Sequence, residues 1–191
     1  MRKAMVIDID KCVGCLACIV ACKVENDGEV GKFWNWVERV GPRGTYPNTE
    51  MYFLPKQCQH CDTPECIEVC PTGASYKRAD GIVLVDTQKC ISCESCIPAC
   101  PYNARVMDSR STFASKCTLC VQLTDKGEET NCVRNCPGKA RFVGDVDDTE
   151  SDIGRLLASV KPAELHKLKD VGNKPVGMYI LRGKRAWTED K

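Results

Sequence analysis

The stretch KCVGCLACIVACK, residues 11–23, places four cysteines within eleven residues. These residues, Cys12, Cys15, Cys18 and Cys22, follow the spacing C-x2-C-x2-C-x3-C. Neither a disulfide framework nor an ordinary hydrophobic core requires thiols at such short and regular intervals. The stretch therefore indicates that several thiolates of one short segment bind a partner other than each other.

The composition predicts an interior that is filled by more than apolar side chains. Hydrophobic residues make up 43% of the 191 residues, and this fraction includes 16 cysteines. The segment before Cys12, MRKAMVIDIDK, lacks the apolar core of a signal peptide, and no run of about 18 apolar residues marks a membrane span. The net charge of +1 creates no general field that would attract nucleic acid. We therefore expect no nucleic-acid partner and no direct membrane span.

The cysteines recur within an internal repeat. MVIDIDKCVGCLAC (residues 5–18) aligns with VLVDTQKCISCESC (residues 83–96), and the closing phrase C-P-x-x-A occurs at residues 70–74, 100–104 and 136–140. Such self-similarity indicates a duplicated structural unit. The cysteines form four groups of four: Cys12, Cys15, Cys18, Cys22; Cys58, Cys61, Cys66, Cys70; Cys90, Cys93, Cys96, Cys100; and Cys117, Cys120, Cys132, Cys136.

The spacing C-x2-C-x2-C-x3-C-P is the run with which bacterial ferredoxins hold iron-sulfur clusters. Three thiolates of the run bind one cluster and the fourth binds another. Cys22 is therefore expected to serve a different cluster from Cys12, Cys15 and Cys18. A cysteine distant in the sequence must then complete the first site.

The gaps between the groups predict which of them share a two-cluster module. Cys70 and Cys90 are 20 residues apart, which leaves room for the strands inside such a module, so the second and third groups form one module. By elimination, the first and fourth groups form the other. We expect four [4Fe-4S] clusters with these ligands: Cys12, Cys15, Cys18 and Cys136; Cys117, Cys120, Cys132 and Cys22; Cys58, Cys61, Cys66 and Cys100; and Cys90, Cys93, Cys96 and Cys70.

The repeated unit predicts an α+β fold with two nested bacterial-ferredoxin-like modules. Each unit is predicted to contain an apolar strand, a cysteine-bearing loop and one or two helical turns that end at a proline. Two strands joined by a Gly/Pro loop are expected in residues 33–54, a capped helix in 149–160 and a late strand in 175–183. The expected organisation is an outer two-cluster module (1–32 and 101–144), a β-hairpin insertion (33–57), an inner two-cluster module (58–100) and a C-terminal docking extension of helix and strand (145–191).

Zinc is the alternative partner of the thiols. A C-x2-C pair such as Cys117 with Cys120 also fits a zinc ribbon. A tetrahedral structural zinc needs two such pairs, however, whereas the repeated triple run displaces its fourth cysteine. We interpret His60, within CQHC, as a residue beside a cluster or at the surface, because the cysteines already complete four sites.

No catalytic motif accompanies the cysteines. The chain contains no G-x-G-x-x-G run, no Walker loop and no recognisable nucleophile motif. We therefore predict a non-catalytic subunit that carries single electrons for an oxidoreductase. The acidic residues Asp62, Glu65 and Glu68 predict a low reduction potential for the Cys58 group, because nearby negative charge disfavours reduction.

The whole pattern resembles the iron-sulfur electron-transfer subunit of the dimethyl sulfoxide reductase and polysulfide reductase family of molybdopterin oxidoreductases. The resemblance is carried by MVIDIDKCVGCLACIVACKVEN, FWNWVERV, CQHCDTPECIEVCPTGA and VGDVDDTESDIGRLL, and it covers nearly the whole chain. It implies a large catalytic partner that holds a molybdenum or tungsten bis-pterin cofactor. In complexes that have one, an integral membrane quinol-reacting subunit is the second partner, and the chain then serves anaerobic respiration.

The resemblance also implies an order of the clusters. The cluster of Cys12 is nearest the catalytic subunit, those of Cys117 and Cys58 follow, and that of Cys90 is farthest away. Export together with the catalytic subunit would place the chain at the outer face of the cytoplasmic membrane, and a cytoplasmic complex is the alternative. The competing functions are a free soluble polyferredoxin and a zinc-rich interaction module.

Overall fold

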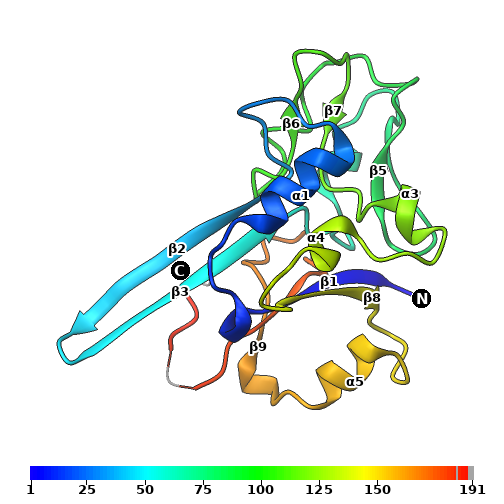
Figure 1. Cartoon of the computed structure of the whole chain (residues 1–191). Helices are drawn as coiled ribbons and strands as arrows, with labels where there is room; N and C mark the ends of the chain where they lie inside the picture. Colours follow the sequence, from blue (N-terminus) through cyan, green and yellow to red (C-terminus); the bar gives the residue numbers. More distant parts are fainter. Residues whose placement is uncertain (184, 189–191) are drawn as a thin grey trace.

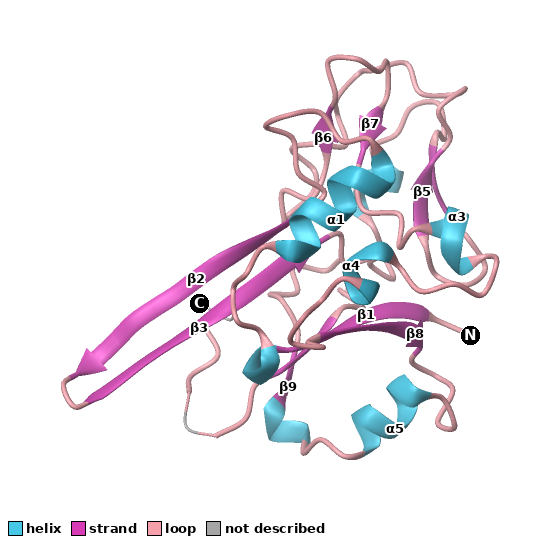
Figure 2. Cartoon of the chain, viewed as in Figure 1, coloured by secondary structure: helices cyan, strands magenta, loops and turns pink. Residues whose placement is uncertain are grey.

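The computed structural model describes residues 1–183 and 185–188. Loops carry most of the cysteines, between short helices and short strands (Figures 1 and 2). The longest helix has 10 residues, and no helix in the described part of the chain is both long and apolar enough for a membrane crossing. The elements in chain order are β1 (Lys3–Asp8), the 3-10 helix η1 (Ile9–Lys11), α1 (Ala17–Asn26), β2 (Asn35–Thr45), β3 (Asn48–Gln57), α2 (Glu65–Glu68), β4 (Ser75–Lys77), β5 (Val83–Val85), β6 (Val106–Met107), β7 (Ala114–Ser115), α3 (Val121–Thr124), α4 (Asn131–Arg134), β8 (Arg141–Asp145), α5 (Asp152–Ala158), the 3-10 helix η2 (Pro162–Glu164), β9 (Leu165–His166) and β10 (Met178–Ile180).

A four-stranded sheet in the order β8-β1-β10-β9 organises the chain. Strand β1 lies inside this sheet, antiparallel to β8 and parallel to β10. Its sequence KAMVID is buried on both faces, which suits a run of apolar residues in a central strand. Because successive side chains alternate between faces, Met5 and Ile7 enter the main apolar cluster and Val6 enters a second one.

The helix predicted in residues 149–160 is confirmed as α5. It begins after Ser151, whose side-chain oxygen accepts a hydrogen bond from the N–H of Gly154 at 3.0 Å. Its buried residue Ile153 packs with Val6 and Ile180 in the second apolar cluster. The helix thus covers the face of the sheet that points away from the main cluster (Figure 1).

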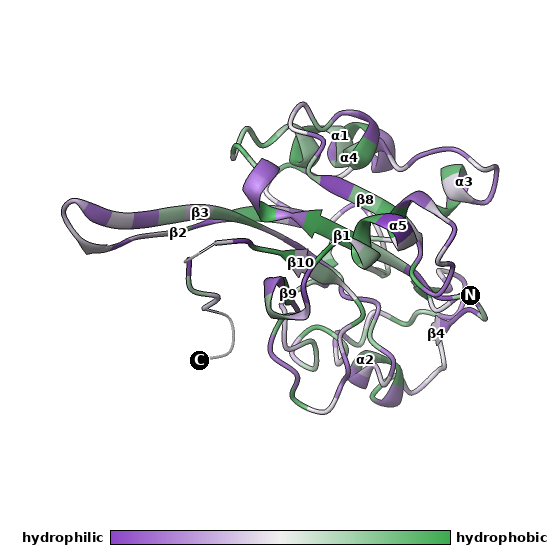
Figure 3. Cartoon of the chain, turned by 90° about the horizontal axis from the view of Figure 1, so that it is seen from below, coloured by the Kyte–Doolittle hydropathy of each residue, from purple (hydrophilic) through white to green (hydrophobic). Residues whose placement is uncertain are grey.

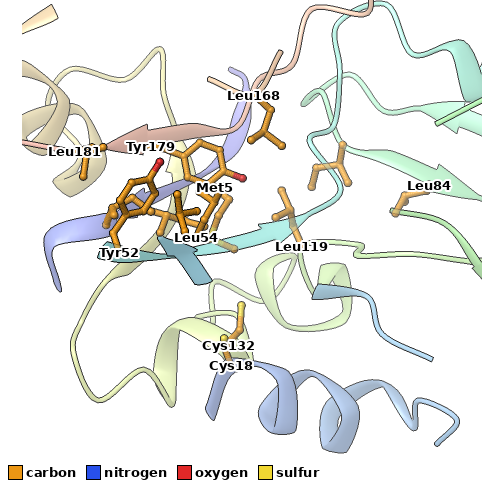
Figure 4. Packing of buried hydrophobic residues seen from close by; sticks show 14 residues of the cluster. Met5, Cys18, Tyr52, Leu54, Leu84, Leu119, Cys132, Leu168, Tyr179 and Leu181 are labelled. Carbon is orange, nitrogen blue, oxygen red and sulfur yellow. The ribbon is translucent and has the colours of Figure 1, made fainter. Parts of the chain in front are cut away.

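The main apolar cluster joins the sheet to the cysteine-bearing segments. Figure 4 shows Tyr52, Leu54 and Tyr179 close together in this cluster, with Cys18 and Cys132 side by side at its edge. All five side chains are less than a tenth exposed. Apolar packing therefore continues directly into the region where the thiols gather.

The late strand predicted in residues 175–183 is confirmed as β10. It pairs with β1 in parallel, with Val6 opposite Met178, and with β9 in antiparallel orientation. Two strands of the C-terminal segment are thus part of the sheet that holds the N-terminal strand. The sequence pattern predicts the strand but not its position beside β1.

Strands β2 and β3 form an antiparallel hairpin that projects from the body as a long arm (Figure 1). The arm is hydrophobic near the body and becomes mostly neutral or hydrophilic toward its tip (Figure 3). The two strands predicted in residues 33–54 are confirmed, but the Gly/Pro residues 41–44 belong to β2 rather than to the loop. Pairing continues across them with a register shift between Val40 and Arg43, and the turn lies at Tyr46 and Pro47.

The internal repeat of the sequence is also a structural repeat. The N–H of Asp8 donates to the carbonyl of Ala140, and the N–H of Asp86 donates to the carbonyl of Ala74, both at 2.7 Å. Each aspartate also pairs with the lysine three residues later, at 3.7 and 3.5 Å. In both copies the end of a C-P-x-x-A phrase is thereby joined to the residues before a cysteine loop.

Gly138 lies against the backbone of the first cysteine loop. A Cβ at this position would be 2.3 Å from the carbonyl oxygen of Lys11, and a backbone atom cannot move aside as a side chain can. We expect Gly138→Ala to destabilise the cluster-loaded protein by about 1–3 kcal/mol, the usual range for overpacking, and to lower its Tm. Gly28→Ala is the control, because the nearest contact of its Cβ is at 3.5 Å. Equal Tm values for the two variants would contradict this close approach.

Candidate metal centres

Four cavities in the structure are each lined by four cysteine side chains. None of the 16 cysteines forms a disulfide. We name the cavities by their cysteines: site I has Cys12, Cys15, Cys18 and Cys136; site II has Cys22, Cys117, Cys120 and Cys132; site III has Cys58, Cys61, Cys66 and Cys100; and site IV has Cys70, Cys90, Cys93 and Cys96.

Each site combines three cysteines of one sequence group with the last cysteine of another group. These are the four sets that the spacing predicts, and the structure brings the members of each set together. Cys18 and Cys22 are only one turn apart on α1, yet they line sites I and II respectively. Within the described residues, no three His, Cys, Asp or Glu side chains are arranged to hold a single metal ion.

Left-handed backbone turns allow three neighbouring cysteines to face one cavity. Gly14 (φ 67°) and Leu16 (φ 64°) separate the cysteines of the first group, and Ser92 (φ 57°) and Glu94 (φ 60°) occupy the equivalent positions of the third group. Non-glycine residues adopt this conformation rarely, and such residues concentrate in functional loops. The repeat therefore preserves a loop conformation as well as a cysteine spacing.

Backbone N–H groups stabilise a negative charge on the last cysteine of three groups. The N–H groups of Ser75, Ala104 and Ala140 donate to the Sγ of the cysteine that opens each C-P-x-x-A phrase, at 3.4, 3.5 and 3.3 Å. A hydrogen bond from an N–H group to an ionised acceptor is stronger than one between neutral groups. In the second and fourth groups the phrase follows a short helix, α2 or α4, and in all three groups it stabilises a thiolate.

Burial works in the opposite direction on other thiols. Burial raises the pKa of Cys22 and of Cys61 to about 12, and it raises the pKa of Cys117 well above its usual value. Neighbouring cysteines at the same site add to these shifts, because several thiolates repel one another. Since the thiolate is the form that binds metal, the sites suit a positively charged metal centre that offsets this cost.

A side chain from the C-terminal segment reaches site III. Asn173 is 1% exposed, and its Nδ2 donates to the Sγ of Cys61 and to the hydroxyl oxygen of Tyr102, both at 2.9 Å. Asn173 was not predicted from the sequence, and no spacing or motif around it signals its role. Only the path of the C-terminal segment across the molecule brings it to the thiol.

Two buried arginines also line the sites. Arg105 lines site III, Arg141 lines both site I and site II, and each is 3% exposed. Neither arginine was predicted from the sequence to belong to a site. Each directly follows a C-P-x-x-A phrase, so the internal repeat contains the signal that could have identified them.

Cations offset the charge of Asp62, one of the three acidic residues around the second cysteine group. Asp62 forms ion pairs with Lys77 at 3.0 Å and with Arg2 at 3.5 Å. Burial opposes the shift, but Lys77 and Arg2 together lower the pKa of Asp62. Lys116 is 2% exposed and donates to the carbonyl of Cys117 at 2.9 Å. The low potential predicted for this group therefore does not follow from its acidic residues alone.

His60 is a buried residue of the fold. It is 2% exposed, and its Nδ1 accepts a hydrogen bond from the N–H of Val83 at 3.0 Å. Burial, together with the nearby charges of Lys116 and Arg105, lowers the pKa of His60 well below its usual value. The surface alternative predicted for His60 is therefore wrong. The neutral histidine joins the second cysteine group to β5 through its hydrogen bond with Val83.

Contacts between the sites arrange them in the order I, II, III, IV. Arg141 lines both site I and site II. Cys117 of site II is close enough to Cys58 of site III for one thiolate to raise the pKa of the other. Arg105 of site III donates at 2.8 Å to the hydroxyl of Ser75, which lines site IV. Consecutive sites therefore share a side chain (I and II), an electrostatic interaction (II and III) or a hydrogen bond (III and IV).

Two family models match the chain, and both are described as a 4Fe-4S dicluster domain. One covers residues 11–74 and the other covers residues 49–146. With the mixture of helix and sheet in the structure, these matches show an α+β protein that contains two ferredoxin-like dicluster domains. The chain thus binds 4Fe-4S clusters.

Subunits of several oxidoreductases are similar to this chain over almost its whole length. The chain is 40% identical to a sulfite dehydrogenase subunit of Allochromatium vinosum, with 95% of this chain and 83% of the relative covered. It is 39% identical to a tetrathionate reductase subunit of Salmonella typhimurium, over 94% of this chain and 72% of the relative. It is 32% identical to the iron-sulfur subunit of an arsenate respiratory reductase of a Shewanella species, over 94% and 96%. The chain therefore belongs to the iron-sulfur electron-transfer subunits of the molybdopterin oxidoreductase family.

Proposed function

We propose that each of sites I to IV holds one [4Fe-4S] cluster, and that the chain relays electrons between two partners along this line of four sites. The observation that carries the proposal is the exposure of the cysteines. Cys15 of site I and Cys93 of site IV are exposed, whereas the cysteines of sites II and III are buried or only partly exposed. A row of sites with exposed cysteines only at its two end sites suits electron transfer between partners bound at opposite ends.

The residues present fit the proposed clusters. Each cavity presents four thiols, the ligand number of a [4Fe-4S] cluster. Both terminal nitrogens of Arg141 are buried without a hydrogen-bond partner among the described residues, and Arg141 lines sites I and II. Such donors suit a negatively charged group with sulfur acceptors.

A [4Fe-4S] cluster supplies one-electron oxidation and reduction when it is bound. The chain itself holds the sites next to one another, directs N–H groups at the thiolates and limits solvent at the two inner sites. We propose no catalytic residue in the chain. Bond-making chemistry belongs to a partner.

We propose a large catalytic subunit with a molybdenum or tungsten bis-pterin cofactor as the partner at the site I end. The site IV end faces an integral membrane quinol-reacting subunit or a soluble redox partner. The names of the relatives support a complex, since each describes one subunit of a reductase or dehydrogenase. The projecting arm formed by β2 and β3 supports docking over the alternative of a free polyferredoxin, which needs no such extension.

The proposal is tested by affinity purification of the chain from anaerobically grown native cells, followed by metal analysis of the recovered material. We expect a large molybdenum- or tungsten-containing subunit in the complex, with about sixteen iron atoms per copy of this chain. Iron without a partner would favour the free polyferredoxin. Zinc without iron would favour the zinc-rich interaction module and contradict the proposal.

A further inference from the structure

Two buried arginines occupy the same position of the internal repeat. Arg105 and Arg141 each follow a C-P-x-x-A phrase directly, at residues 100–104 and 136–140. Each is only 3% exposed. Since arginine is almost never buried without a negative partner, its repetition at one position points to a shared role.

Arg141 lies between sites I and II. It lines both cavities and is the first residue of β8, where it pairs with Ile7 of β1. The strand therefore fixes its backbone, while the side chain extends toward the thiols. Neither of its terminal nitrogens has a hydrogen-bond partner among the described residues. Buried donors of this kind are costly unless an acceptor at the site receives them.

Arg105 has the equivalent place between sites III and IV. Its Nη2 donates to the Sγ of Cys66 in site III at 3.1 Å. Its Nη1 donates at 2.8 Å to the hydroxyl of Ser75, which lines site IV. One guanidinium group thus joins the two sites, as Arg141 joins sites I and II.

Both side chains carry a positive charge, because the guanidinium group stays protonated in proteins. Thiols of both flanking sites lie near each charge: Cys66 and Cys96 near Arg105, and Cys18 and Cys132 near Arg141. A fixed positive charge in a buried place favours the more negative state of any group beside it, and reduction makes a cluster more negative.

We propose that Arg105 and Arg141 tune the reduction potentials of the clusters. Each arginine raises the reduction potentials of the two clusters that flank it. The inference rests on the proposed function, since it assumes that the four sites hold clusters. One charge shared by two sites moves both potentials in the same direction. The difference between the two potentials, which drives electron transfer within each pair, therefore changes little.

The test is a redox titration of the cluster-loaded chain, followed by electron paramagnetic resonance, for Arg105→Gln and Arg141→Gln. We expect Arg105→Gln to lower the reduction equilibrium constants of two clusters at least tenfold, which is 59 mV for one electron, and to leave the other two unchanged. Arg141→Gln should shift the complementary pair. Each variant is thus the control for the other. Arg155→Gln, which removes an exposed arginine on α5, should leave all four potentials unchanged.

The variant Arg105→Lys separates the effect of the positive charge from the effect of side-chain packing, because lysine keeps the charge but loses the forked pair of donors. We expect the lysine to restore at least half of the shift caused by glutamine. Should Arg105→Gln not fold, Ser75→Asp keeps the arginine and sets a carboxylate against it, and the same two potentials should fall. Iron analysis accompanies each titration.

Three results would overturn the arginine proposal while leaving the proposed function intact. These are unchanged potentials in a fully iron-loaded glutamine variant, an equal shift of all four clusters, and no recovery with lysine. A wild-type chain without iron would instead overturn the proposed function. Two clusters shifted per variant, with iron content preserved, supports the proposal.

Discussion

Removing iron and sulfide from the purified protein will abolish its cooperative thermal unfolding transition. Four cysteines line each of the four sites, so the packing there depends on the group that these thiols bind. Cys18 and Cys132 belong to the main apolar cluster, so loss of the bound groups reaches the core itself. Where a metal site forms only on folding, its binding free energy becomes folding free energy, about 10 kcal/mol or more for a structural zinc site. That is comparable with the total stability of an ordinary domain, about 5–15 kcal/mol.

The measurement compares the heat-absorption peak of the loaded chain with that of the chain treated anaerobically with chelator and reductant. Reloading with iron and sulfide should restore the peak, which excludes irreversible damage as the cause of its loss. The second apolar cluster, around Val6, Ile153 and Ile180, contains no cysteine. We therefore expect the stripped chain to keep, at most, residual secondary structure around these residues. A stripped chain that keeps a sharp transition at a similar Tm would contradict this prediction.

Pairs of cysteine substitutions will show which thiols serve the same cluster. Cys22 and Cys132 both line site II, although they lie far apart in the sequence. Each single alanine substitution should remove one cluster, about four iron atoms. The double variant Cys22→Ala with Cys132→Ala should lose no more iron than either single variant, because both changes affect the same cluster.

The matched control pairs Cys22→Ala with Cys136→Ala, which affects sites II and I together. This variant should lose two clusters, about eight iron atoms. Iron per chain, corrected for protein concentration by amino-acid analysis, is the measurement. If the Cys22 and Cys136 pair lost only one cluster, while the Cys22 and Cys132 pair lost two, the assignment of Cys22 would be wrong.

Local spacing predicted much of the candidate sites. A run such as C-x2-C-x2-C binds its ligand within one loop, so the geometry is set by residues close in the sequence. The same holds for α5, whose cap and first turn are local, and for β1 and β10, which are short apolar runs. The repeat also contained the signal for Arg105 and Arg141, because both follow the same phrase.

Contacts between distant segments could not be predicted in this way. Asn173 reaches Cys61 only because β10 lies beside β1 and carries the C-terminal segment across the molecule. The burial of His60 depends on β5, which covers it. Residues 41–44 favour a turn by composition, but pairing with β3 keeps them in a strand with a register shift. In each case long-range packing outweighs a local preference.

Iron and acid-labile sulfide per chain, with Mössbauer spectra of the anaerobically purified protein, test whether the four sites hold four [4Fe-4S] clusters. Four [4Fe-4S] clusters predict about sixteen iron atoms and about sixteen sulfides per chain, all in cubane environments. About twelve iron atoms in a fully folded chain, or zinc in place of iron at any of the four sites, would contradict the account.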